Sequence, residues 1–393
     1  NNNFYYCNGL PFAPSFSLYS EATDTTYFEQ PAKATGNDRF DNAPNKDDWY
    51  ETIKLNYGVD YCNPCGERTE HFDPIPSTWK KMTDILLFWA RKGVDGFRCD
   101  MAEMVPSAFW TYAIKEVKNE FPYILFIGEV YNPSLYDTYI QSGFDYLYDK
   151  VGMYDCVRGV IAGTRKPTEI TKQWQTTDHI KNKMLYFLEN HDEQRIASPF
   201  FANDAEKGFP GVVVSSLLLP NPFMLYAGQE LGEPGMDAEG FSGRDGRTTI
   251  FDYWGIDKLY RGYYKKNALT AQEKVIWDKY NAILRIASKE KVVSVGSFFD
   301  LMYANPLTSN FNSNSLYAFI RAYKQEVLLV IANFSDLEMQ CAINIPRHAF
   351  EHLSLSEGQV NAVDLLTGET TFQMFSPEKP FKVGIDPYGA RVY

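Results

Sequence analysis

Three acidic residues each come at the end of a short apolar run in the middle of the chain. They are Asp100, Glu129 and Asp192, which lie 29 and 63 residues apart. Cleaving a glycosidic bond requires one carboxylic acid that protonates the leaving oxygen and one carboxylate that attacks or stabilises the anomeric carbon. A single acid after a strand is usually a turn residue or a helix cap, but three in one region are hard to explain that way. The three are therefore candidates for acid–base and nucleophilic chemistry.

The residues beside two of these acids fit the same chemistry. Arg98 precedes Asp100 by two positions, and side chains two apart in an extended strand point to the same face. Its guanidinium could therefore keep the Asp100 carboxylate ionised. His191 lies between Asn190 and Asp192. Most single histidines are satisfied core residues, but this polar setting favours a role in binding a substrate.

The acids need a fold that brings the ends of separate strands together. Short, wholly apolar segments alternate with amphipathic helical patterns, which is typical of a parallel sheet covered by helices. No dinucleotide-binding fingerprint follows any of them, so a doubly wound cofactor fold is disfavoured. We therefore expect an α/β barrel, whose catalytic groups lie at the carboxyl ends of the strands. The predicted strands are 94–100, 123–129, 144–149, 184–189 and 222–227.

Three segments of different character divide the chain. Residues 1–76 are rich in Asn, Asp, Gly, Pro and Tyr and are predicted to be loop-rich. Residues 77–290 carry the α/β pattern and end in a helix with a capping box of Thr270 and Glu273. Beyond them the helices are expected to stop, and residues 291–393 are predicted to form an antiparallel β-sandwich. Its expected strands are 316–321, 327–332, 340–345 and 381–385.

The composition bears on the class of partner. The 393 residues include 38 Lys plus Arg and 50 Asp plus Glu, which gives a net charge of −12. Such a charge repels phosphate backbones, so no nucleic-acid partner is expected. No run approaches the roughly 18 apolar residues of a membrane span. Aromatic residues make up 16% of the chain, and their faces can pack against sugar rings, although core packing explains most of them.

The cysteines leave several possibilities open. Only Cys62 and Cys65, of the six cysteines, have a suggestive spacing. They are compatible with a local disulfide, with unlinked thiols, or with a zinc site that includes His71. The zinc site is disfavoured because a structural zinc usually needs a second pair of ligands.

Three blocks around the acids resemble signature blocks of the α-amylase family, glycoside hydrolase family 13. They are residues 95–100 (DGFRCD), 126–130 (FIGEV) and 187–192 (FLENHD), and they follow the order of the family. Weaker similarities lie at 55–57, at 228–230, and at 387–393, which resembles the end of that family's β-sandwich.

The resemblance implies a role for each matching residue. Asp100 is similar to the nucleophile of the family and Glu129 to its general acid/base. Asp192 would grip hydroxyls of the sugar at the cleaved subsite and help to distort it. His191 would hydrogen-bond the same sugar, and Arg98 would orient Asp100.

Two further residues are candidates for substrate binding. Tyr131 is a candidate sugar contact, with a packing role as the alternative. Arg195 is a candidate for an ion pair in the mouth of the barrel, with a plain surface charge as the alternative.

The chain also departs from the family pattern. The first signature block, Asp-x-x-x-Asn-His, and the first three strands have no counterpart in the sequence. The predicted strands therefore correspond to strands 4–8 of a (β/α)8-type barrel, with a loop-rich segment before them and a β-sandwich after them. We expect a missing N-terminal segment or a second chain as partner, because an open sheet would expose its edges and an apolar face.

The resemblance implies no cofactor for the chemistry and permits a structural calcium ion. Typical calcium-dependent α-amylases place a Lys-His pair where this chain has Glu103 and Met104. Asp and Asn residues within 37–48 could supply oxygen ligands, but no calcium-loop spacing is visible and solvated turns are the alternative.

The expected function is hydrolysis of α-1,4-linked glucose polymers or maltooligosaccharides with retention, through a covalent intermediate on Asp100. The alternatives are an α-1,6-glucosidase, a transglycosylase, or a catalytically incomplete carbohydrate-binding fragment. An extracytoplasmic location is favoured because polymeric starch does not cross membranes.

Overall fold

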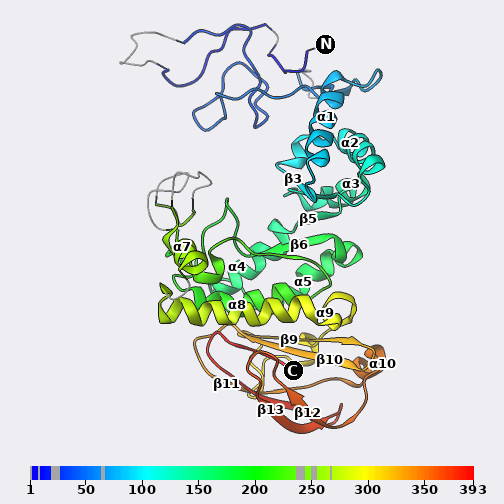
Figure 1. Ribbon diagram of the computed structural model, residues 1–393, viewed down its shortest axis with the longest axis vertical. Helices are drawn as coiled ribbons and strands as arrows, with labels where there is room; N and C mark the ends of the chain where they lie inside the picture. The colour runs from blue at the N-terminus through cyan, green and yellow to red at the C-terminus, as the bar shows by residue number, and fades with distance from the viewer. Residues whose placement is uncertain are drawn as a thin grey trace. The chain divides into compact units, whose positions relative to one another are not determined.

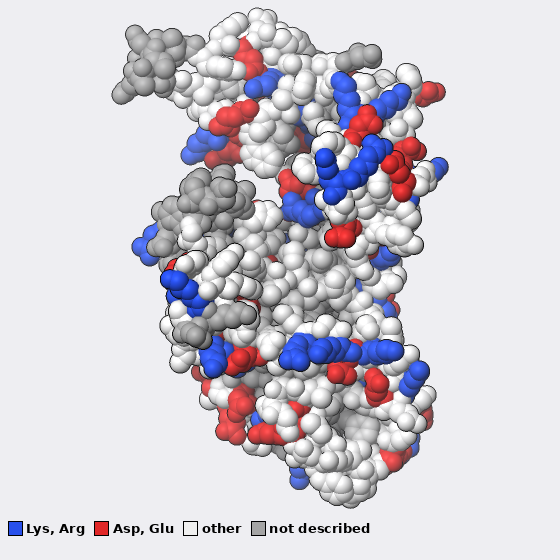
Figure 2. Space-filling view, viewed as in Figure 1, with Lys and Arg blue, Asp and Glu red and all other residues white. Residues whose placement is uncertain are grey.

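The computed structural model forms two compact units, residues 1–147 and 148–393 (Figure 1). None of the helices formed by the described residues has the length and apolar character needed to cross a bilayer. Figure 2 shows acidic and basic side chains mixed on the visible face, so the net charge is not gathered there in one acidic patch. The described residues are 2–7, 9–18, 27–62, 67–235, 244–248, 255–265 and 268–393.

The first part of the first unit is loop-rich and is held together by aromatic side chains. Its described strands are the short antiparallel pair β1 (Val59–Asp60) and β2 (Thr69–Glu70). The rings of Phe40 and Tyr61 stack with their centroids 4.1 Å apart. These rings pack against a small buried cluster of Tyr5, Cys7, Ala32 and Ala34.

Parallel strands and helices alternate in the rest of the first unit. The elements are α1 (Ser77–Arg91), β3 (Gly96–Cys99), η1 (Ala102–Met104), α2 (Ser107–Glu120), β4 (Leu125–Gly128), η2 (Pro133–Leu135), α3 (Tyr136–Gln141) and β5 (Tyr146–Tyr148). β4 pairs in parallel with β3 and with β5. The close approach of β4 to β5 requires glycine at position 128, because a Cβ there would lie 2.8 Å from Leu147 Cδ2.

The α/β pattern continues in the second unit. Its elements are the π-helix η3 (Lys150–Tyr154), α4 (Asp155–Ile161), α5 (Thr168–Thr176), η4 (Asp178–Lys183), β6 (Met184–Phe187), η5 (Ala205–Gly208), α6 (Phe209–Leu217), β7 (Phe223–Met224), η6 (Gln229–Leu231), α7 (Asp257–Tyr264) and α8 (Ala271–Lys289). β6 and β7 are parallel, and the predicted capping box of Thr270 and Glu273 begins α8. Asp149 caps η3: its buried Oδ1 accepts a hydrogen bond from the Met153 amide at 2.9 Å.

Antiparallel strands end the second unit. The elements are α9 (Lys291–Val295), β8 (Ser297–Asp300), η8 (Met302–Ala304), β9 (Leu316–Tyr323), β10 (Glu326–Asn333), β11 (Met339–Ile343), α10 (Arg347–Leu353), β12 (Gly358–Val363), β13 (Thr370–Phe375), β14 (Phe381–Ile385) and β15 (Ala390–Val392). One sheet has the order β15-β10-β9-β8, and β11–β14 and β12–β13 form two further pairs. The predicted antiparallel character of this region is confirmed.

The expectation that helices stop after 290 is wrong. α9 and α10 both lie beyond that point. α10 has only seven residues, of which Ala349, Phe350 and Leu353 are buried. So short a helix shows too little periodicity to be recognised, and packing of its apolar side chains stabilises it instead.

Two polar side chains, one buried and one half-buried, join the antiparallel strands to the helices of the same unit. Arg321 on β9 is fully buried and donates hydrogen bonds to the carbonyls of Leu217, Val293 and Gly296 at 2.8–2.9 Å. Burial lowers its pKa to about 10. The Asp300 carboxylate at the end of β8 accepts hydrogen bonds from three side chains: Thr171, Trp174 and Tyr317.

Candidate active site

The ends of β3 and β4 carry two of the three candidate acids. Asp100 directly follows β3 and Glu129 directly follows β4, so the parallel pairing of these strands places both at the same edge of the sheet. The Arg98 guanidinium forms an ion pair with Asp100, and a second one with Glu129 Oε1 at 2.9 Å. One cation thus pairs with both carboxylates and offsets part of their mutual repulsion.

The two carboxylates differ sharply in their surroundings. The Asp100 side chain is 71% exposed, whereas Glu129 is 5% exposed. Besides the guanidinium, Glu129 accepts hydrogen bonds from the Tyr131 hydroxyl at 2.8 Å and from the Met101 amide at 2.7 Å. The first carboxylate is open to an incoming electrophile, while the second is held by two hydrogen bonds and an ion pair.

The backbone after Asp100 adopts an unusual conformation that places two backbone amides against Glu129. Met101 has φ 42° and ψ 45°, the left-handed region that non-glycine residues seldom enter. This turn directs the Met101 amide at Glu129 Oε2 and brings the Ala102 amide within 3.0 Å of the Glu129 carbonyl. Sequence reasoning missed Met101 because nothing in a methionine side chain signals a left-handed turn.

The third candidate acid follows β6 in the second unit. Asn190 Oδ1 accepts hydrogen bonds from the backbone amides of Asp192 and Glu193, both at 2.9 Å. This turn presents His191 beside Asp192, with Nε2 and Oδ2 3.1 Å apart. Both side chains are partly exposed, at 30% and 38%, so their polar atoms are accessible to a ligand.

Glu193 anchors this turn to the π-helix η3. Its carboxylate accepts a hydrogen bond from the Tyr154 hydroxyl at 2.9 Å and pairs with Lys150 Nζ at 3.3 Å. Sequence reasoning did not single out Glu193. Its place directly after the Asn-His-Asp block was the available signal.

Arg195 is buried and does not reach solvent. Its guanidinium pairs with Glu189 at 2.7 Å, donates to the Ala227 carbonyl at 2.8 Å and lies 4.0 Å from the centre of the Tyr226 ring. Burial raises the pKa of the Glu189 carboxyl, and the charge of Arg195 opposes this rise. The alternative of a plain surface charge is therefore wrong. Because the side chain is only 1% exposed, Arg195 can affect a bound ligand only through Glu189 and the loop it holds.

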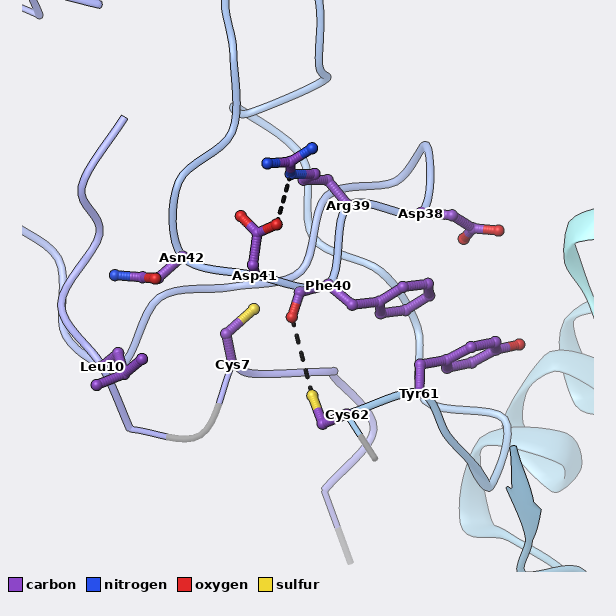
Figure 3. A pocket seen from close by; sticks show the side chains of 9 residues that line it. All are labelled: Cys7, Leu10, Asp38, Arg39, Phe40, Asp41, Asn42, Tyr61 and Cys62. Carbon is purple, nitrogen blue, oxygen red and sulfur yellow. Dashed lines mark hydrogen bonds and ion pairs between the residues drawn. The ribbon is translucent and has the colours of Figure 1, made fainter. Parts of the chain in front are cut away.

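The residues considered as calcium ligands already have partners. Figure 3 shows Asp41 directed at Arg39, and the two side chains are 2.8 Å apart. Asp38 pairs with Lys54, and Asp48 accepts a hydrogen bond from the Asn45 amide at 2.8 Å. Over the described ranges no group of three or more His, Cys, Asp or Glu side chains is arranged to hold a metal ion. Asp38, Asp41 and Asp48 are thus engaged by other groups, and a calcium site within 37–48 stays a prediction.

The same part of the first unit contains a cavity of about 430 Å³ lined by two thiols, Cys7 and Cys62 (Figure 3). The Cys62 thiol lies 3.8 Å from the Phe40 carbonyl. Cys65 lies outside the described residues, so the local disulfide and the zinc site that would use it stay predictions.

The sequence matches a known family model. Residues 75–281, more than half of the chain, match the model described as the α-amylase catalytic domain. Neopullulanase 2 of Thermoactinomyces vulgaris is 22% identical over 82% of this chain and 48% of its own length. Alpha-amylase 3 of Dictyoglomus thermophilum is 24% identical over 67% of this chain and 54% of its own length. The chain thus spans about half the length of these curated relatives.

Solved structures agree at the level of the fold. An α-amylase from Anoxybacillus superposes with a TM-score of 0.61 at 18% identity, covering 84% of this chain and 65% of its own. An α-amylase from Geobacillus thermoleovorans, solved with acarbose, gives 0.60 at 17% identity, covering 84% and 66%. These likenesses confirm the predicted barrel-type class, whereas the numbering of the strands within a barrel stays a prediction.

Proposed function

Since the chain belongs to the α-amylase family, we propose that it carries the catalytic carboxylates of a retaining α-glucan hydrolase. Its substrates would be α-1,4-linked glucose polymers or maltooligosaccharides. The observation that carries the proposal is the Asp100–Arg98–Glu129 cluster at the ends of two neighbouring parallel strands. Retaining glycosidases use two carboxyl groups only about 5–5.5 Å apart, and a shared guanidinium favours such a close pair.

The different exposures of Asp100 and Glu129 suggest which catalytic role each of them has. Asp100, open to solvent and paired with Arg98, attacks the anomeric carbon and forms a glycosyl ester. Glu129, in its protonated form, donates a proton to the leaving oxygen, and its carboxylate then takes a proton from the water that cleaves the ester. Arg98 orients both groups and lowers their mutual repulsion.

We assign Asp192 and His191 to the sugar at the cleaved bond. A carboxylate and an imidazole beside each other can accept from and donate to neighbouring hydroxyl groups. The Asn190 turn and the Glu193 anchor fix their direction. Convergence of these residues with Asp100 and Glu129 around one sugar is part of the proposal, as is a direct sugar contact by Tyr131.

We also propose that further polypeptide completes the sheet of this chain. Among the described residues β3 pairs with β4 alone. Ile85, Phe88 and Trp89 of α1 in the same unit are 50–52% exposed. A missing N-terminal segment or a second chain that adds a parallel strand and its helix would cover both features.

The test is release of reducing ends from soluble starch, maltoheptaose and pullulan, by this chain and by any longer natural form. We expect cleavage of the first two, and loss of at least about a thousandfold in kcat for Asp100→Asn and Glu129→Gln, since these groups act in the transition state. Glu120→Gln is the matched control, because Glu120 forms an exposed ion pair with Arg91. Activity of Asp100→Asn at the parent rate would refute the assignment.

The same assay separates the alternatives. Products longer than maltoheptaose would indicate a transglycosylase, and cleavage of pullulan at its α-1,6 bonds would indicate an α-1,6-glucosidase. Binding of maltoheptaose by calorimetry, without turnover in any form of the protein, would indicate a carbohydrate-binding fragment.

A further inference from the structure

We propose that His348 and His352 on α10 form a chelating site for a divalent transition-metal ion, for which Zn²⁺ is the natural probe. The site makes no use of the carboxylates that the hydrolytic function requires. It consists of two imidazoles on one helix and a tyrosine hydroxyl, Tyr303, that orients the first of them. Figure 1 shows α10 at the edge of the antiparallel strands.

The spacing places both imidazoles on one side of the helix. Residues four apart in an α-helix lie one above the other, so their side chains share a face. Both rings contact the same neighbour, Phe299 of β8, with centroids 5.2 Å and 5.9 Å from its own. Both histidines are exposed on the surface of α10. A pair of histidines four apart on one helix face is a recurring zinc-binding arrangement.

Tyr303 supplies the third part of the site. Its hydroxyl oxygen lies 3.2 Å from His348 Nδ1 and also contacts Nε2. Its ring packs against that imidazole, with centroids 5.3 Å apart. When the imidazole N–H donates to the hydroxyl oxygen, such a hydrogen bond fixes the orientation of the ring and raises the basicity of the other ring nitrogen. Imidazole nitrogens bind Zn²⁺ at about 2.0–2.1 Å, and water would fill the positions that protein atoms leave open.

The charges nearby do not oppose a cation. Arg347 is the cationic neighbour on the same helix, and its guanidinium is paired with Glu357 at 3.0 Å and with Glu378. Glu351 is exposed between the two histidines in sequence and adds negative charge to the same turn. An ion at this site would therefore lie near the paired guanidinium of Arg347 and the exposed carboxylate of Glu351.

The affinity of the site should depend on the pH and on the identity of the metal ion. Imidazoles bind metal only when neutral, so affinity should be lower in acid than at pH 7.5. Affinity should also be higher for Cu²⁺ than for Zn²⁺, the order that nitrogen ligands impose.

Calorimetric titration of the intact chain with Zn²⁺ at pH 7.5 tests the proposal. We expect one ion per chain, and about tenfold or greater weakening in His348→Gln and in His352→Gln, because each removes one arm of a chelate. Tyr303→Phe should weaken binding less, and His179→Gln should leave it unchanged. Affinity equal to that of the parent in both α10 variants would overturn the proposal. Loss of binding in His71→Gln would overturn it too, since the ion would then lie near Cys62.

A second measurement needs no variant. Substoichiometric Cu²⁺ should broaden the imidazole proton resonances of two histidines together, before those of the other three. Assignment of the two signals to His348 and His352 supports the site. Uniform broadening of all five would show that no chelating pair exists.

Discussion

The hydroxyl of Tyr131 donates a hydrogen bond to Oε1 of Glu129, the oxygen that also pairs with Arg98. A residue that the sequence suggested as a sugar contact or a packing residue thus holds the proposed proton donor in place. The hydrogen bond is 2.8 Å long and spans only two positions of the chain, so it depends on the local course of the backbone after β4.

Tyr131→Phe should therefore lower kcat more than it raises KM. Loss of one such hydrogen bond is worth about 1 kcal/mol, which corresponds to roughly a fivefold fall in rate. Steady-state kinetics on maltoheptaose would check this. A change in KM alone would instead assign Tyr131 to the sugar.

Glu193→Gln should weaken the proposed sugar contacts of Asp192 without touching Asp100. The substitution keeps an acceptor for Tyr154 but removes the ion pair with Lys150. We expect a severalfold loss of maltoheptaose affinity and faster hydrogen exchange of the Asp192 amide. Lys181→Gln, which removes an exposed ion pair with Asp178, is the control. Unchanged exchange at Asp192 would contradict the anchoring role.

Asp149→Asn should stabilise the protein near neutral pH. Burial raises the pKa of Asp149 from 3.8 to about 6, so the folded state holds its proton more tightly than the unfolded chain does. Stability therefore falls as the pH rises from about 4 to about 6, and at pH 7 the carboxylate costs about 3 kcal/mol. Asparagine retains the acceptor for the Met153 amide and removes the charge.

Urea unfolding of this variant and of the parent should therefore give equal midpoints at pH 4 and a higher midpoint for the variant at pH 7. A difference that is the same at both pH values would show that packing, not charge, explains it.

Glu273→Gln should show the opposite pH dependence. The Arg261 guanidinium holds the pKa of Glu273 well below its usual range, at about 2. A lowered pKa stabilises the folded state above about pH 4.5, and this contribution is lost as the pH falls toward 2. The parent should therefore be more stable than the variant at pH 7, and the two should converge near pH 2. Glutamine still accepts from the Thr270 amide, so the helix cap stays intact.

Much of the architecture was predictable from hydrophobic pattern alone. Each of the five apolar segments contains a parallel strand. β6 is buried at all its positions, as expected for an apolar strand covered on both faces. The Thr270–Glu273 box also needed only local sequence. The short α10 was missed because tertiary contacts of Phe350 and its neighbours, rather than intrinsic preference, stabilise it.

The candidate site was predictable only in part. Asp100, Glu129 and Asp192 stand out because acids at strand ends carry a chemical signature. Their supports do not, since the Met101 turn depends on backbone angles and the Glu189–Arg195 pair on burial. Neither backbone angles nor burial can be read from residue type alone.

The buried guanidinium of Arg321 has a practical consequence for anyone dividing this polypeptide. One of its three carbonyl acceptors, on Leu217, comes from α6. Two of the donors to Asp300, Thr171 and Trp174, come from α5. Excising residues 291–393 as a separate module would remove these partners from both side chains. Residue 290 is thus a poor place to divide the chain.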